Sequence, residues 1–396
     1  MDKKKIAVLS VSALNIMTNA SLAPVLFYLN QAFPEVSITN IRLLLTLPAL
    51  VIIFSSLLTG YLASRMPKRT LLFIGLFTYL LGGVGAGFCN SFTAILVMRI
   101  LVGLGAGVTN TFATSLISNF YKGEERAQLV GYSSVVAHAV AIAAPLITGN
   151  LASISWRYAF GIYLLAVVVM IITWFWLPEP PQHENGPMEK KLVLNNMVYV
   201  IAFNTLMFMA TFYIFPTGIA HLFHTRGFGD SRAAGLATSI STSASTLINF
   251  FFAPIIRFFK RFIWVFGLGF MVLGFFIIAN AQQLFGVYCG VFVSGCGTGV
   301  LLPAIMLRAT QYAPNNNPSR AVSMVVAGSN LGMFLSPMLY AFYQRMNPGI
   351  EVILFDFRMG LILFSTALLI ALVLVLIPNK KCGRTSGIKM DKHLML

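Results

Sequence analysis

Apolar runs of roughly 20 residues alternate with short polar breaks along almost the whole chain. A helix rises 1.5 Å per residue, so a run of this length covers the roughly 30 Å of hydrocarbon in a bilayer. The runs fall near residues 6–29, 43–64, 70–89, 92–119, 129–152, 158–177, 195–222, 233–257, 262–281, 285–308, 321–344 and 354–377. This pattern predicts an all-α membrane protein with twelve transmembrane helices.

The composition supports a membrane protein and excludes several other classes. Of the 396 residues, 58% are hydrophobic and only 10% are charged, whereas soluble domains have about 25% charged residues. A soluble enzyme, a secreted disulfide scaffold and a disordered chain are therefore excluded. The four cysteines are scattered without metal-ligand spacing, and no Ser/His/Asp set or phosphate-binding loop indicates catalysis. We expect no metal, no cofactor and no enzymatic activity.

The net charge of +16 raises the question of nucleic-acid binding, and the positions of the charges answer it. Most of the 27 Lys and Arg residues fall in alternate loops, on the side that carries Lys3, Lys4 and Lys5. Basic residues concentrate on the cytoplasmic side of membrane proteins. The distribution predicts a multi-pass protein of the plasma membrane with both termini in the cytoplasm, and no nucleic-acid partner.

The two halves of the chain resemble each other. GLGAG at Gly103–Gly107 recurs as GCGTG at Gly295–Gly299, and Pro145 recurs as Pro337, each 192 residues later. A repeated offset of this kind indicates a duplicated six-helix unit, an architecture used by transporters. The polar, Pro-rich segment from Pro178 to Lys191 separates the copies. We therefore predict a bundle at 1–177, a cytoplasmic linker at 178–194, a second bundle at 195–377 and a basic cytoplasmic tail at 378–396.

Several local patterns resemble the major facilitator superfamily, and the similarity covers essentially the whole chain. GYLASRMPKRTLL resembles the loop between the second and third spans of that family, although Ser64 replaces its usual Asp. RILVGLGAG, which starts at Arg99, is similar to a drug-exporter pattern. AAPLITG, which ends at Gly149, is similar to a degenerate antiporter signature. The loop residues that match the family, and to which the resemblance gives a conformational role, are Gly60, Arg65, Lys68 and Arg69.

The resemblance implies a secondary transporter that works by alternating access and is closest to the drug-proton antiporter branch. A proton-coupled antiporter of this kind normally carries its proton on a membrane-embedded carboxylate. All acidic residues are expected outside the spans, Glu35 and Asp356 among them on the outer side. Coupling would then use another group, a boundary carboxylate such as Glu35 that enters the cavity, or no proton at all.

Arg99 and His138 are the embedded side chains with the clearest chemistry. A charge inside the membrane is costly, so Arg99 should face the cavity or a partner. One alternative is that Arg99 holds the first half together, and the other is that it binds substrate or takes part in coupling. His138 is able to titrate near neutral pH; it either bonds across helices as a neutral group or carries a proton.

Further residues are candidates for the substrate cavity or for helix packing. Small residues let helices approach closely, and we expect them to let the two halves rock, while interior prolines bend helices. The packing and bending candidates are Gly103, Gly105, Gly107, Pro145, Gly295, Gly297, Gly299 and Pro337. The cavity candidates, which alternatively form interhelical bonds, are Asn15, Asn19, Asn110, Asn204, Tyr213, Asn249 and Asn330, besides Arg99 and His138.

Two functional hypotheses follow. The first is a monomeric transporter that exports small amphipathic compounds in exchange for protons. The second is an organic-anion facilitator or proton symporter with Arg99 as the anion anchor. In both hypotheses the partners are a small-molecule substrate, the lipid bilayer and, where transport is coupled, protons.

Overall fold

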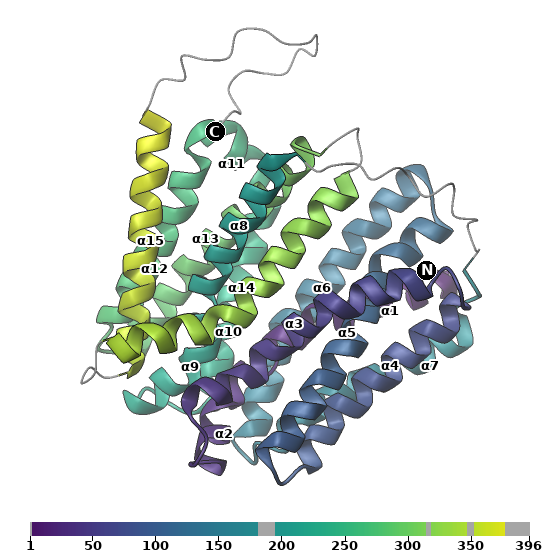
Figure 1. Cartoon of the computed structure of the whole chain (residues 1–396), viewed down its shortest axis with the longest axis horizontal. Helices are drawn as coiled ribbons and strands as arrows, with labels where there is room; N and C mark the ends of the chain where they lie inside the picture. Colours follow the sequence, from purple (N-terminus) through teal and green to yellow (C-terminus); the bar gives the residue numbers. More distant parts are fainter. Residues whose placement is uncertain (1, 181–194, 314–317, 347–351, 377–396) are drawn as a thin grey trace, which may run out of the picture.

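The computed structural model describes residues 2–180, 195–313, 318–346 and 352–376, and all elements in these ranges are helical. The longer helices pack side by side in one bundle (Figure 1). The first half of the chain forms α1 (Lys3–Ala20), η1 (Ala23–Val25), α2 (Leu26–Ala32), α3 (Ile38–Leu62), α4 (Lys68–Gly85), η2 (Ala86–Phe88), α5 (Phe92–Phe120), α6 (Gly123–Ala152), η3 (Tyr158–Leu164) and α7 (Leu165–Trp176). The second half forms α8 (Asn196–Phe212), α9 (Ile214–Thr225), α10 (Ser231–Phe250), α11 (Phe252–Phe259), η4 (Lys260–Phe262), α12 (Ile263–Asn280), α13 (Leu284–Gln311), α14 (Pro318–Met346) and α15 (Val352–Leu376). The predicted tail and most of the predicted linker lie outside the described residues, so the domain boundaries stay a prediction.

Polar side chains cap the helices where the apolar runs begin. Ser37 Oγ accepts a hydrogen bond of 3.3 Å from the Asn40 amide at the start of α3. Ser91 does the same for α5 at 3.2 Å, and Asp230 caps α10. Such caps satisfy amide groups that the first turn of a helix leaves unpaired. The polar breaks in the sequence therefore become the helix boundaries.

Several of the twelve predicted spans are not single α-helices, and the two at the start of each half show why. The span near 6–29 consists of α1, η1 and α2, because Pro24 in η1 has no amide hydrogen with which to continue a helix. The span near 195–222 is divided at Tyr213 into α8 and α9. In the described part of the chain, ten helical segments are long and apolar enough to cross a membrane, with Asn196–Thr225 taken as one segment. The segments below that standard are α1, which begins with three lysines, and α10, which is rich in Ser and Thr.

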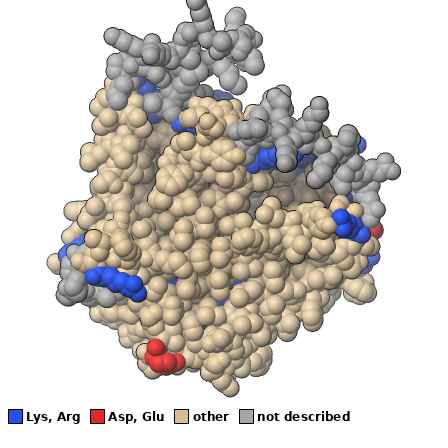
Figure 2. Space-filling model, viewed as in Figure 1, with Lys and Arg blue, Asp and Glu red and all other residues tan. Residues whose placement is uncertain are grey.

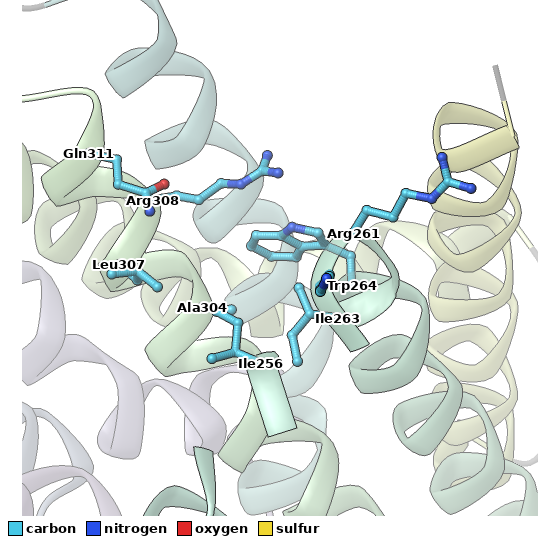
Figure 3. Close-up of a pocket in the computed structure, with 9 residues that line it drawn as sticks. Ile256, Arg261, Ile263, Trp264, Ala304, Leu307, Arg308 and Gln311 are labelled. Carbon is cyan, nitrogen blue, oxygen red and sulfur yellow. The ribbon is translucent and has the colours of Figure 1, made fainter. Parts of the chain in front are cut away.

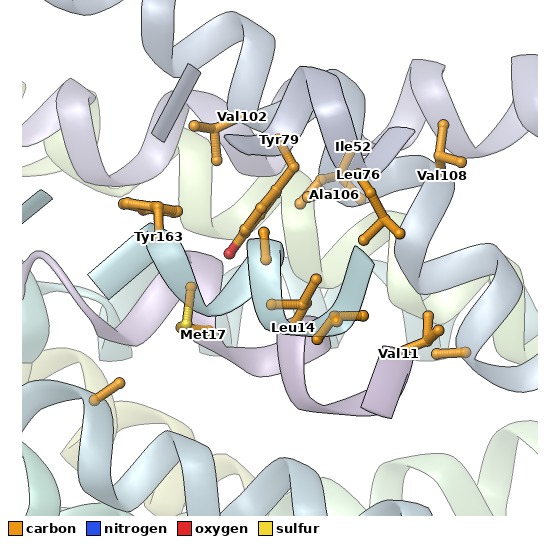
Figure 4. Close-up of a cluster of buried hydrophobic side chains, with 14 of the residues drawn as sticks. Val11, Leu14, Met17, Ile52, Leu76, Tyr79, Val102, Ala106, Val108 and Tyr163 are labelled. Carbon is orange, nitrogen blue, oxygen red and sulfur yellow. The ribbon is translucent and has the colours of Figure 1, made fainter. Parts of the chain in front are cut away.

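The buried apolar side chains form two main clusters, one for each half of the chain. The larger joins α1 to α7 and includes Leu14, Tyr79 and Tyr163 (Figure 4). The other joins α9 to α15 around Phe275 and Phe357. Each half thus has its own core, as expected for a duplicated six-helix unit.

The outside of the bundle is apolar. Phe54, Phe88, Trp174 and Phe285 are 64%, 80%, 62% and 75% exposed, and soluble proteins rarely expose apolar surface on this scale. In Figure 2 most visible charged residues lie towards the rims, and the broad middle of this face is uncharged. This is the surface of a multi-pass membrane protein.

Candidate functional site: the contact between the two halves

The two ends of the bundle differ in charge. Lys5, Arg69, Lys122 and Lys260 lie at the ends of α1, α4, α6 and α11, and we call this side the basic end. Because α6 begins there at Gly123, its last turns reach the opposite end, where α10 begins at Ser231. At that opposite end the two halves meet.

Small residues bring α6 and α10 into backbone contact. The Ser231 hydroxyl donates a 2.7 Å hydrogen bond to the Gly149 carbonyl, and the Ser239 hydroxyl donates one of 2.7 Å to the Ile142 carbonyl. A Cβ atom on Gly149 would lie 2.6 Å from the Ser231 carbonyl oxygen, and one on Gly235 would collide with the Pro145 carbonyl. We call this contact the α6–α10 seal. The α6 side of the seal includes AAPLITG, the stretch ending at Gly149 that is similar to the antiporter signature.

A buried ion pair also joins the halves at the opposite end. Arg42 in α3 and Asp356 in α15 are 1% and 0% exposed, and Arg42 Nη2 lies 2.6 Å from Asp356 Oδ2. The Gln344 side-chain amide of α14 donates a 2.6 Å hydrogen bond to the other oxygen of the same carboxylate. Three helices from both halves therefore converge on one carboxylate.

This pair corrects the sequence analysis. Asp356, at the beginning of the run near 354–377, was expected on the outer side and outside the membrane, but it is 0% exposed inside α15, which begins at Val352. An isolated carboxylate inside a membrane is costly. The cost is offset here by Arg42, which lies 314 positions away in the chain.

An aromatic contact adds to the closure. The Phe27 ring of α2 stacks on His224 of α9 with 3.7 Å between ring centroids, and it meets His221 edge to face at 5.3 Å. Phe27 also packs with the buried Ala220 and Ala234 of the second half. Apolar packing, backbone contact and an ion pair thus close the same end of the bundle.

Arg99 lies inside the first half. It is 0% exposed, and its two terminal nitrogens donate hydrogen bonds of 2.9 and 3.0 Å to the Tyr163 hydroxyl. Tyr163 in turn packs against Tyr79, whose hydroxyl accepts a 3.3 Å hydrogen bond from Thr18 (Figure 4). In this conformation Arg99 is bonded within the core of its own half.

His138 lies near the middle of α6 and is partly exposed. Its Nδ1 atom is 2.8 Å from the Ser134 carbonyl of the same helix. Among the described residues no hydrogen bond joins this ring to another helix. His138 precedes Ile142 by one turn, so it borders the α6–α10 seal on the side of the basic end.

The other cavity candidates are spread over several environments. The side chains of Asn15 and Asn19 lie outside the part that the structure describes. Asn204 is exposed, whereas Tyr213 and Asn330 are buried. Asn110 and Asn249 are partly buried, and their Oδ1 atoms have no hydrogen-bond partner among the described residues. No contact in that part of the chain joins these residues into one site, and their role in a cavity stays a prediction.

The repeated glycines pack helices within each half. Gly103 and Gly107 meet α3 and Gly105 meets α4, while Gly295 and Gly299 meet α10 and Gly297 meets α12. These glycines therefore tighten each half and do not form the contact between the halves. Pro145 and Pro337 lie inside α6 and α14, and Pro145 is the proline that reaches the seal.

The loop after α3 is attached to the end of α7. The Arg69 guanidinium donates a 2.5 Å hydrogen bond to the Trp174 carbonyl, and its backbone amide donates one of 3.3 Å to the Glu179 carboxylate. The Arg65 guanidinium lies over the Tyr61 ring, 4.3 Å from the centroid. Gly60 is exposed, and a Cβ atom added to it would meet no other atom within 4 Å, so this glycine is not needed for close packing here.

Comparison with known proteins agrees with this fold. The family model of the Major Facilitator Superfamily matches residues 8–229 and 197–387. The chain therefore belongs to the Major Facilitator Superfamily. None of the curated protein sequences compared with the chain matches it.

Solved transporters have the same fold at low sequence identity. A D-xylose-proton symporter is 17% identical with a TM-score of 0.76, over 94% of this chain and 96% of that one. A bacterial homologue of the human lysosomal transporter Spinster, in an inward-facing and occupied conformation, is 16% identical with a TM-score of 0.75, over 94% and 95%. The human organic anion transporter MFSD10 is 13% identical with a TM-score of 0.65, over 93% and 99%. The protein is thus a secondary transporter and not an enzyme.

Proposed function

We propose that this transporter exports small amphipathic compounds across the plasma membrane in exchange for protons, as a monomer. The basic end faces the cytoplasm in this proposal, because Lys and Arg concentrate on the cytoplasmic side of membrane proteins. Both chain ends are then cytoplasmic, and the end closed by Arg42, Phe27 and the α6–α10 seal faces outward. Transport requires that this end opens while the basic end closes.

The position of His138 carries the proposal of proton exchange. An imidazole is able to take up and release a proton, and this one is partly exposed with no described bond to another helix. It also borders the seal, so separation of α6 from α10 would open a path to it from the outer side. A group that is reached from each side in turn is what proton exchange requires.

The environment of Arg99 favours amphipathic compounds over anions. The anion hypothesis needs a guanidinium that is free to bind a carboxylate. Arg99 is fully buried and bonded to Tyr163 within the first half, so it presents no charge to a substrate in this conformation. Neutral or cationic amphipathic compounds are the better match.

The test uses proteoliposomes with an imposed pH gradient and a fluorescent amphipathic amine as substrate. We expect the His138→Gln variant to lose accumulation driven by the gradient and to keep downhill exchange of the amine. His393→Gln serves as the control, because this histidine lies in the predicted tail, beyond the last predicted span. Unchanged gradient-driven accumulation in His138→Gln would remove the proton role of His138. Anion flux without any amine flux in the wild-type protein would overturn the exporter proposal itself.

A further inference from the structure

A small pocket at the basic end is lined by cationic and aromatic side chains. It lies between α11, α12 and α13, and its lining includes Ile256, Lys260, Arg261, Trp264, Leu307 and Arg308 (Figure 3). This pocket is separate from the contact between the halves, since all of its walls belong to the second half. The proposed transport mechanism makes no use of it.

Within the described segments, no acidic residue compensates the charges of the pocket. Arg308 is partly buried in the last turn of α13, and its guanidinium carbon lies 5.2 Å from the centroid of the Trp264 ring. Figure 3 shows the Arg308 side chain and the Trp264 ring next to each other, with Arg261 extending outward. No ion pair within the described ranges involves Lys260, Arg261 or Arg308. A partly buried cation without a counter-ion attracts anions.

The first half has a matching loop, and the comparison isolates the unusual feature. Arg65, Lys68 and Arg69 recur as Arg257, Lys260 and Arg261, each 192 residues later. In the first half, Arg69 is bonded to the Trp174 carbonyl and to Glu179. Neither Lys260 nor Arg261 has a corresponding described hydrogen bond, so the second copy of the loop keeps its positive charge available.

The backbone holds this loop in a costly conformation. Lys260 has φ of 44°, and among the described residues it is the one non-glycine residue with positive φ. Residues other than glycine rarely adopt a positive φ, and backbone strain of this kind concentrates at functional sites. Here the turn passes directly from α11 into η4 and α12 and sets Lys260 beside the pocket.

The surroundings of the pocket are those of a membrane interface. Helix α11 has no buried residue, and Phe251, Phe258 and Phe262 are 55%, 80% and 39% exposed. Aromatic and basic side chains side by side are typical of the region where acyl chains meet lipid headgroups. An anionic group that reaches this pocket from the bilayer is the headgroup of a lipid and carries apolar acyl chains. The exposed phenylalanines provide contact for these chains.

We propose that the pocket binds the phosphate headgroup of an anionic phospholipid from the leaflet at the basic end. Arg308 and Lys260 bind the phosphate oxygens, Arg261 adds charge at the rim, and Trp264 supports Arg308. The acyl chains lie along the exposed phenylalanines. Basic pockets between transmembrane helices are known to take anionic headgroups.

The fluorescence of Trp264 gives a local test in purified protein. Brominated lipids quench a nearby indole, and the difference between the wild type and Trp264→Phe isolates this residue from the other tryptophans. We expect brominated phosphatidylglycerol to quench Trp264 at a concentration at least about fivefold lower than brominated phosphatidylcholine. The preference should be lost in Lys260→Gln/Arg308→Gln and reduced in Lys260→Gln/Arg261→Gln, whose side chains are exposed.

A charge-matched control separates a defined site from general attraction. Lys122→Gln/Arg126→Gln removes two exposed charges at the same end, away from the pocket, and should keep the preference. Equal loss in this control, or an unchanged preference in both pocket variants, would overturn the proposal. Displacement of the brominated lipid by millimolar glycerol phosphate or inorganic phosphate would show a site for free phosphate instead. None of these outcomes tests the proposal that the protein exchanges compounds for protons, because that proposal is tested by transport measurements.

Discussion

Two arginines are buried in the described part of the protein, and their partners differ. Arg99 is bonded to Tyr163, a neutral residue of its own half, whereas Arg42 is bonded to Asp356, a carboxylate of the other half. Separation of the halves would leave the contacts of Arg99 in place and break those of Arg42. Arg99 therefore contributes to the stability of the first half, whereas Arg42 contributes to the equilibrium between conformations.

The energies of the two sites follow from this difference. Arg99 has no counter-ion in the described core, and two hydrogen bonds and the Tyr163 ring, 5.4 Å from its guanidinium carbon, offset its burial. Arg42 gains a full opposite charge, but removal of one partner from a buried pair costs about 3–5 kcal/mol because the other charge stays buried and unpaired. Opening of the end that we propose faces outward, here called the outer end, would relieve that cost by hydration.

The largest expected effect comes from breaking the pair. Arg42→Gln or Asp356→Asn should destabilise the closed outer end by about 3–5 kcal/mol, more than a hundredfold in population. Spin labels at Glu35→Cys and Thr225→Cys, in a background without native cysteines, report the distance between the halves at that end. We expect this distance to increase in each single variant, and exchange transport to fall at least about tenfold.

The double variant Arg42→Gln/Asp356→Asn tests whether the two residues act as a pair. With both charges removed, the amide side chains are able to bond to each other, and the outer end should close again to near the wild-type distance. Additive opening in the double variant would mean that the two residues act independently.

The sequence predicts the helical class well and the pair not at all. Apolar runs and helix caps such as Ser37 and Ser91 are local features, so span positions follow from them. The partnership of Arg42 with Asp356 depends on how α3 meets α15, which no local pattern encodes. Hydropathy also places Asp356 at a span end, where a carboxylate is ordinarily hydrated. Its burial follows from tertiary contacts with Arg42 of α3 and Gln344 of α14.

The seal has a signal in the sequence that the pattern of apolar runs does not reveal. Ser231, Gly235 and Ser239 recur at a spacing of four in α10, a pattern that allows close helix contact. Gly103 and Gly295 were also predicted to allow close helix contact and so to let the halves rock, but these glycines contact helices of their own half. The spacing indicates that one face of the helix carries small side chains. Which helix packs against that face depends on the tertiary fold.

A smaller effect is expected from the Tyr163→Phe substitution. It removes the hydroxyl that accepts both Arg99 hydrogen bonds, and unpaired buried donors cost about 1–3 kcal/mol. The thermal unfolding temperature in detergent should fall, while the label distance at the outer end stays unchanged. An increased distance would mean that Arg99, like Arg42, affects the equilibrium between conformations, and the two arginines would not differ in this way.

The smallest effect comes from a single methyl group in the seal. Gly149→Ala places a Cβ atom 2.6 Å from the Ser231 carbonyl oxygen, a backbone atom, in this closed conformation. Such overpacking costs about 1–3 kcal/mol, so the label distance should increase without any change of charge. Gly131→Ala is the matched control on the same helix, because nothing lies within 4 Å of its Cβ position. Alanine favours the helix over glycine, so Gly131→Ala should leave the distance unchanged and unfold no earlier than the wild type. Equal opening in both variants would show that helix propensity in α6, and not contact with α10, sets the closure.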